Sequence, residues 1–215
     1  MIIGVFDSGL GGLSVSNSVK TAFPNVEVKF VNDREHVPYG KKGKQELLKL
    51  ALPLLKKMEQ DGCNVIVIAC NTLTTTVIKE LRENIDVPLV AVEPMVKPAA
   101  VLTKNKTIAV CATPATLSSK RYSDLKQEYA KGIKVIEPDC SNWAELIEKS
   151  KLDQNQIKET VEYILAKNAD VIVLGCTHYH WIEEDIQKLA GDKAVILQPE
   201  EAIIRRLKQT LEQLV

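Results

Sequence analysis

The chain has 215 residues, a length that suits one large domain or two small ones. Hydrophobic residues make up 45% of it and charged residues 26%, and 28 basic side chains balance 28 acidic ones. A formal charge of zero gives no support to a nucleic-acid partner. No apolar run is long enough to span a bilayer, and residues 1–6 lack the basic start of a signal peptide, so we expect no membrane partner.

Short apolar runs alternate with helical patterns along the chain. Strands are predicted at residues 2–6, 26–31, 65–68, 89–92, 107–110, 134–136, 171–174 and 194–197. Helices are predicted at residues 45–60, 74–84, 142–149, 156–167, 184–190 and 200–214. The runs are continuously apolar more often than alternating, which is typical of parallel strands covered on both faces. The densest basic stretch, Lys41-Lys42-Gly43-Lys44, is interpreted as a solvated helix start.

The sequence contains an internal repeat. Residues 64–72 read NVIVIACNT and residues 170–178 read DVIVLGCTH, so each copy joins a branched apolar run to a cysteine and a polar turn. A spacing of about a hundred residues indicates a duplicated half. We expect an α/β fold of two pseudosymmetric lobes, each with a mainly parallel sheet flanked by helices, and an active site in the cleft between them. The first lobe would hold residues 1–95 plus 198–215 and the second 96–197, with prolines in the connections.

Five cysteines occur at wide spacing and without a C-x-x-C motif, which predicts free thiols in a reducing cytoplasm. Cys70 and Cys176 each follow a predicted parallel strand, and ligands of α/β sheets bind at the carboxyl ends of strands. Facing lobes would place these two thiols on opposite sides of one bound molecule. A racemase needs such a pair, because it removes a proton from one face of a carbon and delivers one to the other. Cys63, Cys111 and Cys140 are interpreted as buried hydrophobic side chains.

Polar turns follow both cysteines. Asn71 and Thr72 follow Cys70, and Thr177 and His178 follow Cys176. Side-chain amides, hydroxyls and turn amides can bind a carboxylate, although helix capping explains Asn71 and Thr177 equally well.

The first strand ends in Asp7 and Ser8, within GVFDSGLGGLSV. Its glycines allow a tight turn close to a ligand but do not form G-x-G-x-x-G or a P-loop, so nothing implies a nucleotide. Asp7 could orient or deprotonate Cys70, accept a substrate ammonium group, or only cap a helix.

Several segments together resemble glutamate racemases. FDSGLGGLSV, VPYG, ACNT, ATPATLSS and VLGCTHY follow one another in that family's order and with about its spacing, over nearly the whole chain. Aspartate and hydantoin racemases of the same superfamily also have two cysteines, but within different motifs.

The resemblance implies interconversion of L- and D-glutamate, which supplies D-glutamate for bacterial peptidoglycan without pyridoxal phosphate, a metal or another cofactor. It implies that Cys70 removes the α-proton of D-glutamate and Cys176 that of L-glutamate. Asp7 and His178 would assist the two cysteines, and Glu148 would support the histidine. A homodimer is a further expectation. The implied substrate-binding residues are Asp7, Ser8, Pro38, Tyr39, Gly40, Asn71, Thr72, Thr116, Thr177 and His178.

Some positions depart from the family pattern. Residues 32–36 read Asn-Asp-Arg-Glu-His, where the family usually has Gly-Asp-Thr/Ser-Ala-Arg, and His180 stands where it usually has proline. The chain is also short for the family and has no extension before the first strand, so regulation that depends on such an extension is not expected.

Other functions fit parts of the sequence. Cys176, His178 and His180 would point the same way from an extended segment and could hold a hydrolytic metal ion. A Cys–His nucleophile for acyl transfer would leave the second cysteine unexplained. A racemase of another acidic amino acid such as aspartate, and a non-catalytic two-lobed amino-acid-binding protein, are further alternatives.

Overall fold

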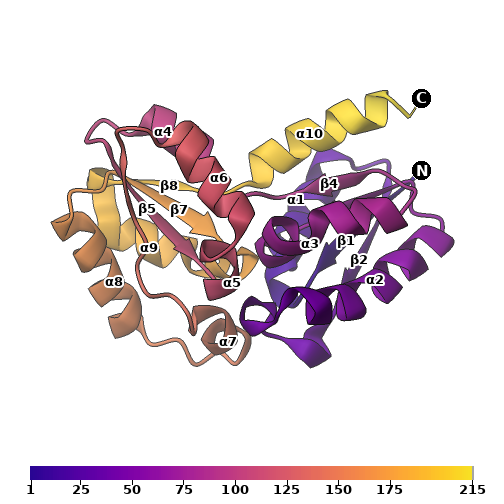
Figure 1. Ribbon diagram of the computed structural model, residues 1–215, viewed down its shortest axis with the longest axis horizontal. Helices are drawn as coiled ribbons and strands as arrows, with labels where there is room; N and C mark the ends of the chain where they lie inside the picture. The colour runs from indigo at the N-terminus through magenta and orange to yellow at the C-terminus, as the bar shows by residue number, and fades with distance from the viewer. Residues whose placement is uncertain (215) are drawn as a thin grey trace.

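Two α/β lobes lie side by side, each built on a four-stranded parallel sheet (Figure 1). The computed structural model describes residues 1–214. The strand order is β2-β1-β3-β4 in the first sheet and β6-β5-β7-β8 in the second, so the two halves share one strand arrangement. Every strand pairing in both sheets is parallel. The predicted fold class, two pseudosymmetric α/β lobes, is confirmed.

The eight predicted strands are all present, with ends that differ by at most two residues. They are β1 (Ile2–Asp7), β2 (Glu27–Asn32), β3 (Val65–Ile68), β4 (Leu89–Ala91), β5 (Thr107–Ala112), β6 (Lys134–Ile136), β7 (Val171–Gly175) and β8 (Val195–Leu197). The central strands β3, β5 and β7 are buried at every residue. Continuous runs of branched apolar side chains suit such strands, because helices cover both sheet faces.

The helices outnumber those predicted. They are α1 (Leu13–Ala22), α2 (Lys44–Gln60), α3 (Asn71–Asn84), α4 (Val96–Leu102), α5 (Pro114–Leu117), α6 (Lys120–Tyr129), α7 (Trp143–Glu148), α8 (Gln154–Ala166), α9 (Glu183–Ala190) and α10 (Glu200–Glu212). Short 3-10 helices are η1 (Leu10–Gly12), η2 (Arg34–His36), η3 (Tyr39–Lys41), η4 (Thr177–Ile182) and η5 (Gly191–Lys193). Of these α-helices, α1, α4, α5 and α6 were not predicted.

The unpredicted helices have weak intrinsic signals. In α1, serines and β-branched residues lower the helix propensity, but Val15 and Val19 lie one turn apart and are buried against the first sheet. In α6 most residues are polar, and the helix depends on buried Tyr122 and Leu125 and on the Ser119 hydroxyl, which caps the Tyr122 N–H at 3.1 Å. Tertiary packing and capping therefore decide these two segments.

The prediction that prolines near the lobe boundary lie in connections is wrong for Pro98. This residue is the third residue of α4. The first four N–H groups of a helix have no intrahelical acceptor, so proline is tolerated in its first turn.

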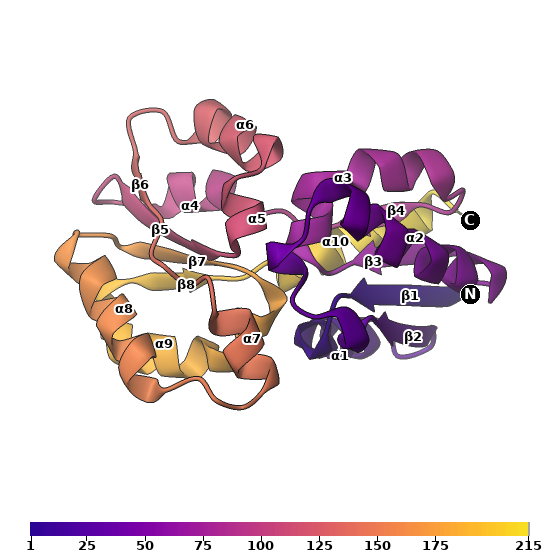
Figure 2. The same ribbon diagram turned by 60° about the horizontal axis from the view of Figure 1, so that its bottom comes forward.

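Helices cover both faces of each sheet (Figure 2). On the first sheet, α2 and α3 pack on one face, and α1 and α10 pack on the other. On the second sheet, α7, α8 and α9 cover one face, and α4 and α6 cover the opposite face. Within the described chain, no helix has the length and apolar character needed to cross a membrane.

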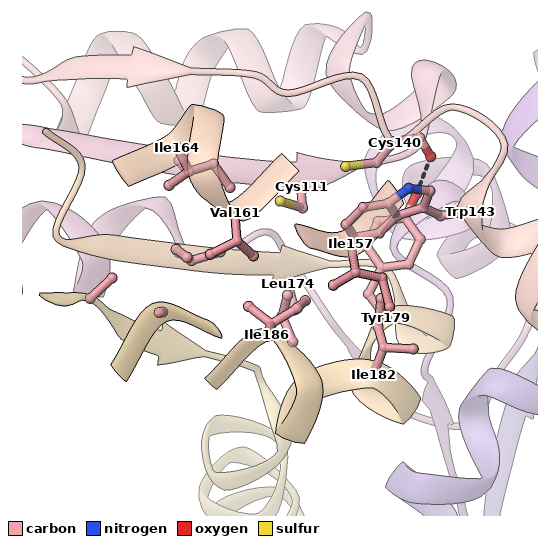
Figure 3. Close-up of a cluster of buried hydrophobic side chains, with 14 of the residues drawn as sticks. Cys111, Cys140, Trp143, Ile157, Val161, Ile164, Leu174, Tyr179, Ile182 and Ile186 are labelled. Atoms are coloured by element: carbon pink, nitrogen blue, oxygen red, sulfur yellow. Dashed lines mark hydrogen bonds between the residues drawn. The ribbon is translucent and has the colours of Figure 1, made fainter. Parts of the chain in front are cut away.

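The core of the second lobe fixes the segment that follows β7 (Figure 3). Tyr179 of η4 is fully buried and packs edge-on against Trp143 of α7, with ring centroids 5.4 Å apart. The Tyr179 hydroxyl donates to the Cys140 carbonyl at 2.8 Å, and that carbonyl also accepts the Trp143 N–H at 3.1 Å. These contacts hold η4 and α7 in a fixed relation. The five cysteines within the described residues are all buried, free thiols.

The last helix returns from the second lobe to the first, as the yellow ribbon of Figure 1 shows. Ile203, Leu207 and Leu211 of α10 are buried against apolar residues of β1 and β3. We propose the lobe boundaries predicted above, residues 1–95 plus 198–215 and residues 96–197, and the packing of α10 supports them. Val215 lies outside the described residues.

Substitution of Leu207, which is fully buried between α10 and the first sheet, tests this packing. We expect Leu207→Ala to lower the free energy of unfolding by about 2–5 kcal/mol, because it removes apolar contacts and leaves a cavity. Urea denaturation followed by circular dichroism measures the change. The neighbouring exposed Lys208→Ala is the control and should change stability by about 0.5 kcal/mol or less. Equal effects of the two substitutions would contradict the packing of α10 on this sheet.

Candidate active site

Cys70 and Cys176 lie at the carboxyl ends of β3 and β7, the corresponding strands of the two sheets. Cys70 directly precedes α3, and Cys176 directly precedes η4. Both cysteines line one closed cavity between the lobes, here called the two-cysteine cavity. Its lining residues are Ser8, Pro38, Tyr39, Gly40, Cys70, Asn71, Thr72, Thr113, Ala144, Cys176, Thr177 and His178.

The free volume of the two-cysteine cavity is only about 10 Å³. A space of that size holds about one water molecule, so an amino acid does not fit while the lobes lie this close. The structure therefore corresponds to a closed arrangement of the two lobes, and the lobes must separate to admit a ligand.

The surroundings of Cys70 favour the protonated thiol. The thiol donates to the Ser8 hydroxyl oxygen, at an Sγ–Oγ distance of 3.6 Å. Burial and the nearby charge of Asp7 raise the pKa of Cys70 to about 12, although the Leu73 N–H and Ser8 partly stabilise the thiolate. In this arrangement Cys70 is therefore a proton donor at neutral pH.

Cys176 is joined to an acid–base pair. Its Sγ lies 3.7 Å from His178 Nδ1, and His178 Nε2 lies 2.9 Å from Glu148 Oε1. Burial alone would lower the pKa of His178, but the hydrogen bonds to Cys176 and Glu148 outweigh it and raise the pKa to about 10. Burial likewise opposes ionisation of Glu148, but the contact with His178 and the Leu10 N–H lower the pKa of this carboxyl. His178 is therefore an imidazolium that bridges a sulfur and a carboxylate.

Asp7 lies beneath the cavity and has two roles in the local structure. Its Oδ2 accepts the Gly12 N–H at 2.7 Å and the Thr177 hydroxyl at 3.1 Å, so it both caps the start of α1 and contacts the second lobe. Burial raises the pKa of Asp7 despite these hydrogen bonds and the charge of His178. The Asp7 Oδ1 is buried without a hydrogen-bond partner among the residues that the structure describes. Such an oxygen can accept a further donor.

The glycine-rich turn of the first lobe presses directly on the second lobe. A Cβ on Gly11 would lie 2.6 Å from the His178 backbone nitrogen and 2.7 Å from Thr177 Oγ1, so only glycine allows this approach. The adjacent Leu10 N–H donates to Glu148 Oε1 at 2.6 Å. Arg34 of η2 adds a more distant ion pair, with Nε 3.7 Å from Glu148 Oε2. The first lobe thus completes the surroundings of His178.

Neutral polar groups form much of the remaining wall. The Asn71 side chain is buried, and both its amide atoms have no partner within residues 1–214. Thr72 Oγ1 and Thr113 Oγ1 lie 3.0 Å apart across the lobe boundary. Tyr39 donates its hydroxyl to Asp33 at 2.6 Å, which raises the Tyr39 pKa further than burial alone. Unpaired amide atoms that face a cavity are available to a carboxylate.

The structure brings together most of the residues predicted from the sequence. Asp7 and Glu148 do not line the cavity but contact residues that do. Thr116 lies one step behind the wall, where its side chain accepts a hydrogen bond from Thr113 Oγ1 at 3.1 Å. Thr113 and Ala144 line the cavity and were missed. The ATPATLSS segment contains Thr113 and could have indicated it, whereas Ala144 has no sequence signal.

The arrangement of His180 does not support the alternative metal site. Residues 177–182 form a 3-10 helix instead of an extended strand, so the three side chains do not point the same way. His180 Nδ1 lies 3.2 Å from Ser14 Oγ and 3.5 Å from Glu200 Oε1 instead of facing Cys176. Among the described residues, no cluster of three acidic, histidine or cysteine side chains is arranged to bind a metal ion.

A larger cavity, of about 320 Å³, lies near the connections between the lobes. It is lined by residues such as Glu93, Arg121 and Arg206, and neither cysteine reaches it. The two cysteines that the sequence predicts to be catalytic therefore line only the smaller cavity.

The sequence and the fold both match known racemases. The Asp/Glu/hydantoin racemase family matches residues 13–207. A glutamate racemase of Clostridium perfringens strain 13 is 37% identical over 98% of this chain and 83% of its own length. One from Pseudomonas aeruginosa PAO1 is 36% identical over 97% of this chain and 81% of its own length. The resemblance predicted from the motifs is confirmed.

Solved structures agree. Escherichia coli glutamate racemase, in complex with L-glutamate and the activator UDP-MurNAc-Ala, superposes with a TM-score of 0.91 at 28% identity, covering 98% of this chain and 82% of that one. Francisella tularensis glutamate racemase, in complex with D-glutamate, superposes with a TM-score of 0.82 at 29% identity, covering 98% and 81%. The chain therefore belongs to the Asp/Glu/hydantoin racemase family and is an amino-acid racemase.

Proposed function

We propose that this racemase interconverts L- and D-glutamate, with Cys70 and Cys176 acting on opposite faces of the α-carbon. The observation that carries the proposal is that two thiols, one from each lobe, line a single closed cavity. The similarity to racemases that bind L- and D-glutamate supports glutamate as the substrate. The product D-glutamate would serve peptidoglycan synthesis in the cytoplasm. Assembly of this racemase as a homodimer stays a prediction.

In the proposed reaction one sulfur removes the α-proton as a thiolate, and the other delivers a proton to the opposite face as a thiol. For L-glutamate, Cys176 is the base and Cys70 is the acid, and for D-glutamate these roles are reversed. Each turnover therefore leaves the two sulfurs with exchanged protonation states. Proton exchange between the sulfurs and solvent, or reaction in the opposite direction, restores the starting state.

The difficult step is removal of a proton that is far less acidic than a thiol. The site must therefore stabilise the developing negative charge more strongly than it stabilises bound substrate. Asn71, Thr72 and Thr177 offer neutral donors, and the amino end of α3 faces the same cavity from behind Cys70. In a cavity closed to water, such fixed dipoles act with little screening.

The groups behind the sulfurs have different tasks in this proposal. Asp7 assists Cys70, and its unpaired Oδ1 is available to a thiol proton or to the substrate ammonium group. His178 assists Cys176, and Glu148 keeps His178 oriented and protonated. The first lobe contributes to the cavity wall through Ser8, Pro38, Tyr39 and Gly40. Thr116 does not line the cavity and acts only through Thr113.

Incubation with L-glutamate in deuterated water tests the proposal directly. We expect deuterium at Cα together with loss of optical activity, because each protonation uses a proton that has exchanged with solvent. Proton NMR and polarimetry measure the two effects. L-aspartate, run in parallel, should exchange far more slowly. Faster exchange with aspartate than with glutamate would replace the proposed substrate, and no exchange with either would contradict the proposed reaction.

Removal of either thiol should stop racemisation in both directions. For Cys70→Ala and Cys176→Ala we expect kcat to fall by about 10²-fold or more, because each direction needs both an acid and a base. The circular dichroism signal of the free amino acid, recorded with L- or D-glutamate as the starting substrate, follows each direction separately. Cys63→Ala, which removes a buried thiol of the first-lobe core, is the matched control and should retain activity. Near-normal turnover by either site variant would argue against two-base chemistry.

The Glu148 carboxylate should control the alkaline limb of the pH profile. Its hydrogen bond helps to hold the His178 pKa near 10, so the imidazolium persists below that pH and is lost above it. In Glu148→Gln this support is missing, and we expect the His178 pKa and the alkaline limb of kcat/KM to move down by about one pH unit or more. The equilibrium constant between mirror images is unity, so both directions must show the same limb.

NMR titration of histidine-labelled protein measures the His178 pKa without reference to activity. Glu159→Gln, an exposed position on α8, serves as the control and should leave the titration unchanged. An unchanged His178 titration in Glu148→Gln would show that the carboxylate does not set the charge of the imidazole.

A further inference from the structure

A second hollow adjoins the two-cysteine cavity at the boundary between the lobes. Its volume is about 700 Å³, and its wall contains Lys41, Lys42 and Lys44 from the first lobe and Lys120 from the second. We call it the lysine groove. Gly40 lines both the groove and the two-cysteine cavity, so the two spaces share a wall. The Lys41-Lys42-Gly43-Lys44 stretch of the sequence is therefore part of the approach to the site, in addition to starting α2.

The four lysines lie closer to the groove than their anionic partners do. Each forms an ion pair at 2.5–3.3 Å, with partners Glu145, Glu46, Glu80 and Asp124 respectively. None of these four carboxylates is among the described residues that line the groove, whose other members are neutral. Exposed ion pairs of this kind are weak and exchange partners readily. The groove therefore presents cationic and neutral polar groups to a molecule that enters it.

The wall between the groove and the cavity is a contact between the two lobes. A Cβ on Gly40 would lie 2.6 Å from Thr113 Cβ, so the first-lobe backbone packs tightly on a second-lobe side chain. Thr113 also lies 3.0 Å from Thr72 across the same boundary, measured between the hydroxyl oxygens. Separation of the lobes at this contact would join the groove to the cavity. No covalent change is required for that step.

The cavity itself has little positive charge with which to attract an anion. Of the described residues that line it, only His178 has a basic side chain, and its charge is held in a buried pair with Glu148, whereas the lysine pairs of the groove are exposed and weak. Glutamate carries two carboxylates and one ammonium group, so it approaches as a net anion. Attraction over a distance must then come from charges outside the cavity, and the lysine groove supplies them next to the wall that has to open.

We propose that the lysine groove is the antechamber through which an anionic amino acid reaches the two cysteines, passing between Gly40 and Thr113. This inference rests on the proposed function and adds the route and the residues that select for negative charge. Lys44 and Lys120 line the groove from opposite lobes. They concentrate the dicarboxylate substrate at the lobe boundary and take no part in proton transfer.

The double variant Lys44→Gln/Lys120→Gln tests the antechamber. Both side chains are exposed by half or more, so their loss should not unfold the protein. At an ionic strength of about 10 mM, where charges act over about 30 Å, we expect kcat/KM for L-glutamate to fall about threefold or more, through KM, with kcat retained. At about 1 M salt the difference from the unaltered protein should disappear, because the Debye length is then about 3 Å.

The matched control is Lys158→Gln/Lys188→Gln. These lysines also form exposed ion pairs, but on α8 and α9, which contribute no residue to the groove. The control removes the same total charge and should leave kcat/KM and its salt dependence nearly unchanged. Equal salt dependence in the two double variants would overturn the proposal, because net charge alone would then explain the effect.

A gain of charge distinguishes attraction from simple damage. Ser118 is exposed and lines the groove, so Ser118→Lys adds a cation there. We expect it to raise kcat/KM at low salt and to lose this advantage at high salt. A decrease at all salt concentrations would count against the antechamber. Absence of deuterium exchange in the unaltered protein would instead refute the proposed function, so the two failures are distinguishable.

Discussion

The site depends on one carboxylate oxygen, Oε1 of Glu148. It accepts the Leu10 N–H of the first lobe at 2.6 Å and lies 2.9 Å from His178 Nε2 of the second. Both contacts are partly buried, and hydrogen bonds to a charged group contribute about 1.5–3 kcal/mol each. Separation of the lobes, which the proposed function requires, would remove the Leu10 contact and admit water to the carboxylate. In that proposal, lobe closure and the charge on His178 are coupled through this oxygen.

The two thiols occupy corresponding places in the two sheets but have different surroundings. Burial and the nearby carboxylate of Asp7 favour the thiol form of Cys70, and they outweigh the Ser8 hydroxyl, which favours the thiolate. Cys176 instead lies 3.7 Å from Nδ1 of the His178 imidazolium. The duplicated strand arrangement thus places the sulfurs symmetrically, while unlike neighbours, such as His178 where the first copy has Thr72, make the site asymmetric. A substrate ammonium group near Asp7 would offset the charge that disfavours the Cys70 thiolate.

The amino-acid sequence is sufficient where the information is local. The two strand–cysteine–turn segments encode buried strands and their polar ends, so the pattern alone places Cys70, Cys176 and their neighbours at the carboxyl edges of the sheets. It is insufficient where a property depends on contact between the lobes. Thr113 lies in the cavity wall, where Gly40 and Thr72 of the other lobe pack against it. No local sequence pattern specifies this contact between the lobes. Helix α6 escapes prediction for a related reason, since two buried side chains and a serine cap hold an otherwise polar segment.

The lysines line the groove, whereas neutral hydrogen-bond donors line most of the cavity, and this distribution has a physical reason. A lysine inside so small a cavity would either bear a large desolvation cost or lose its proton. Neutral donors such as Asn71 avoid that cost and can be fixed in place before the negative charge develops. Hydrated lysines at the lobe boundary attract the anion at a distance without entering the site. In the proposed reaction, selection for a charged substrate and stabilisation of its carbanion therefore fall to different residues, so each can be optimised without loss to the other.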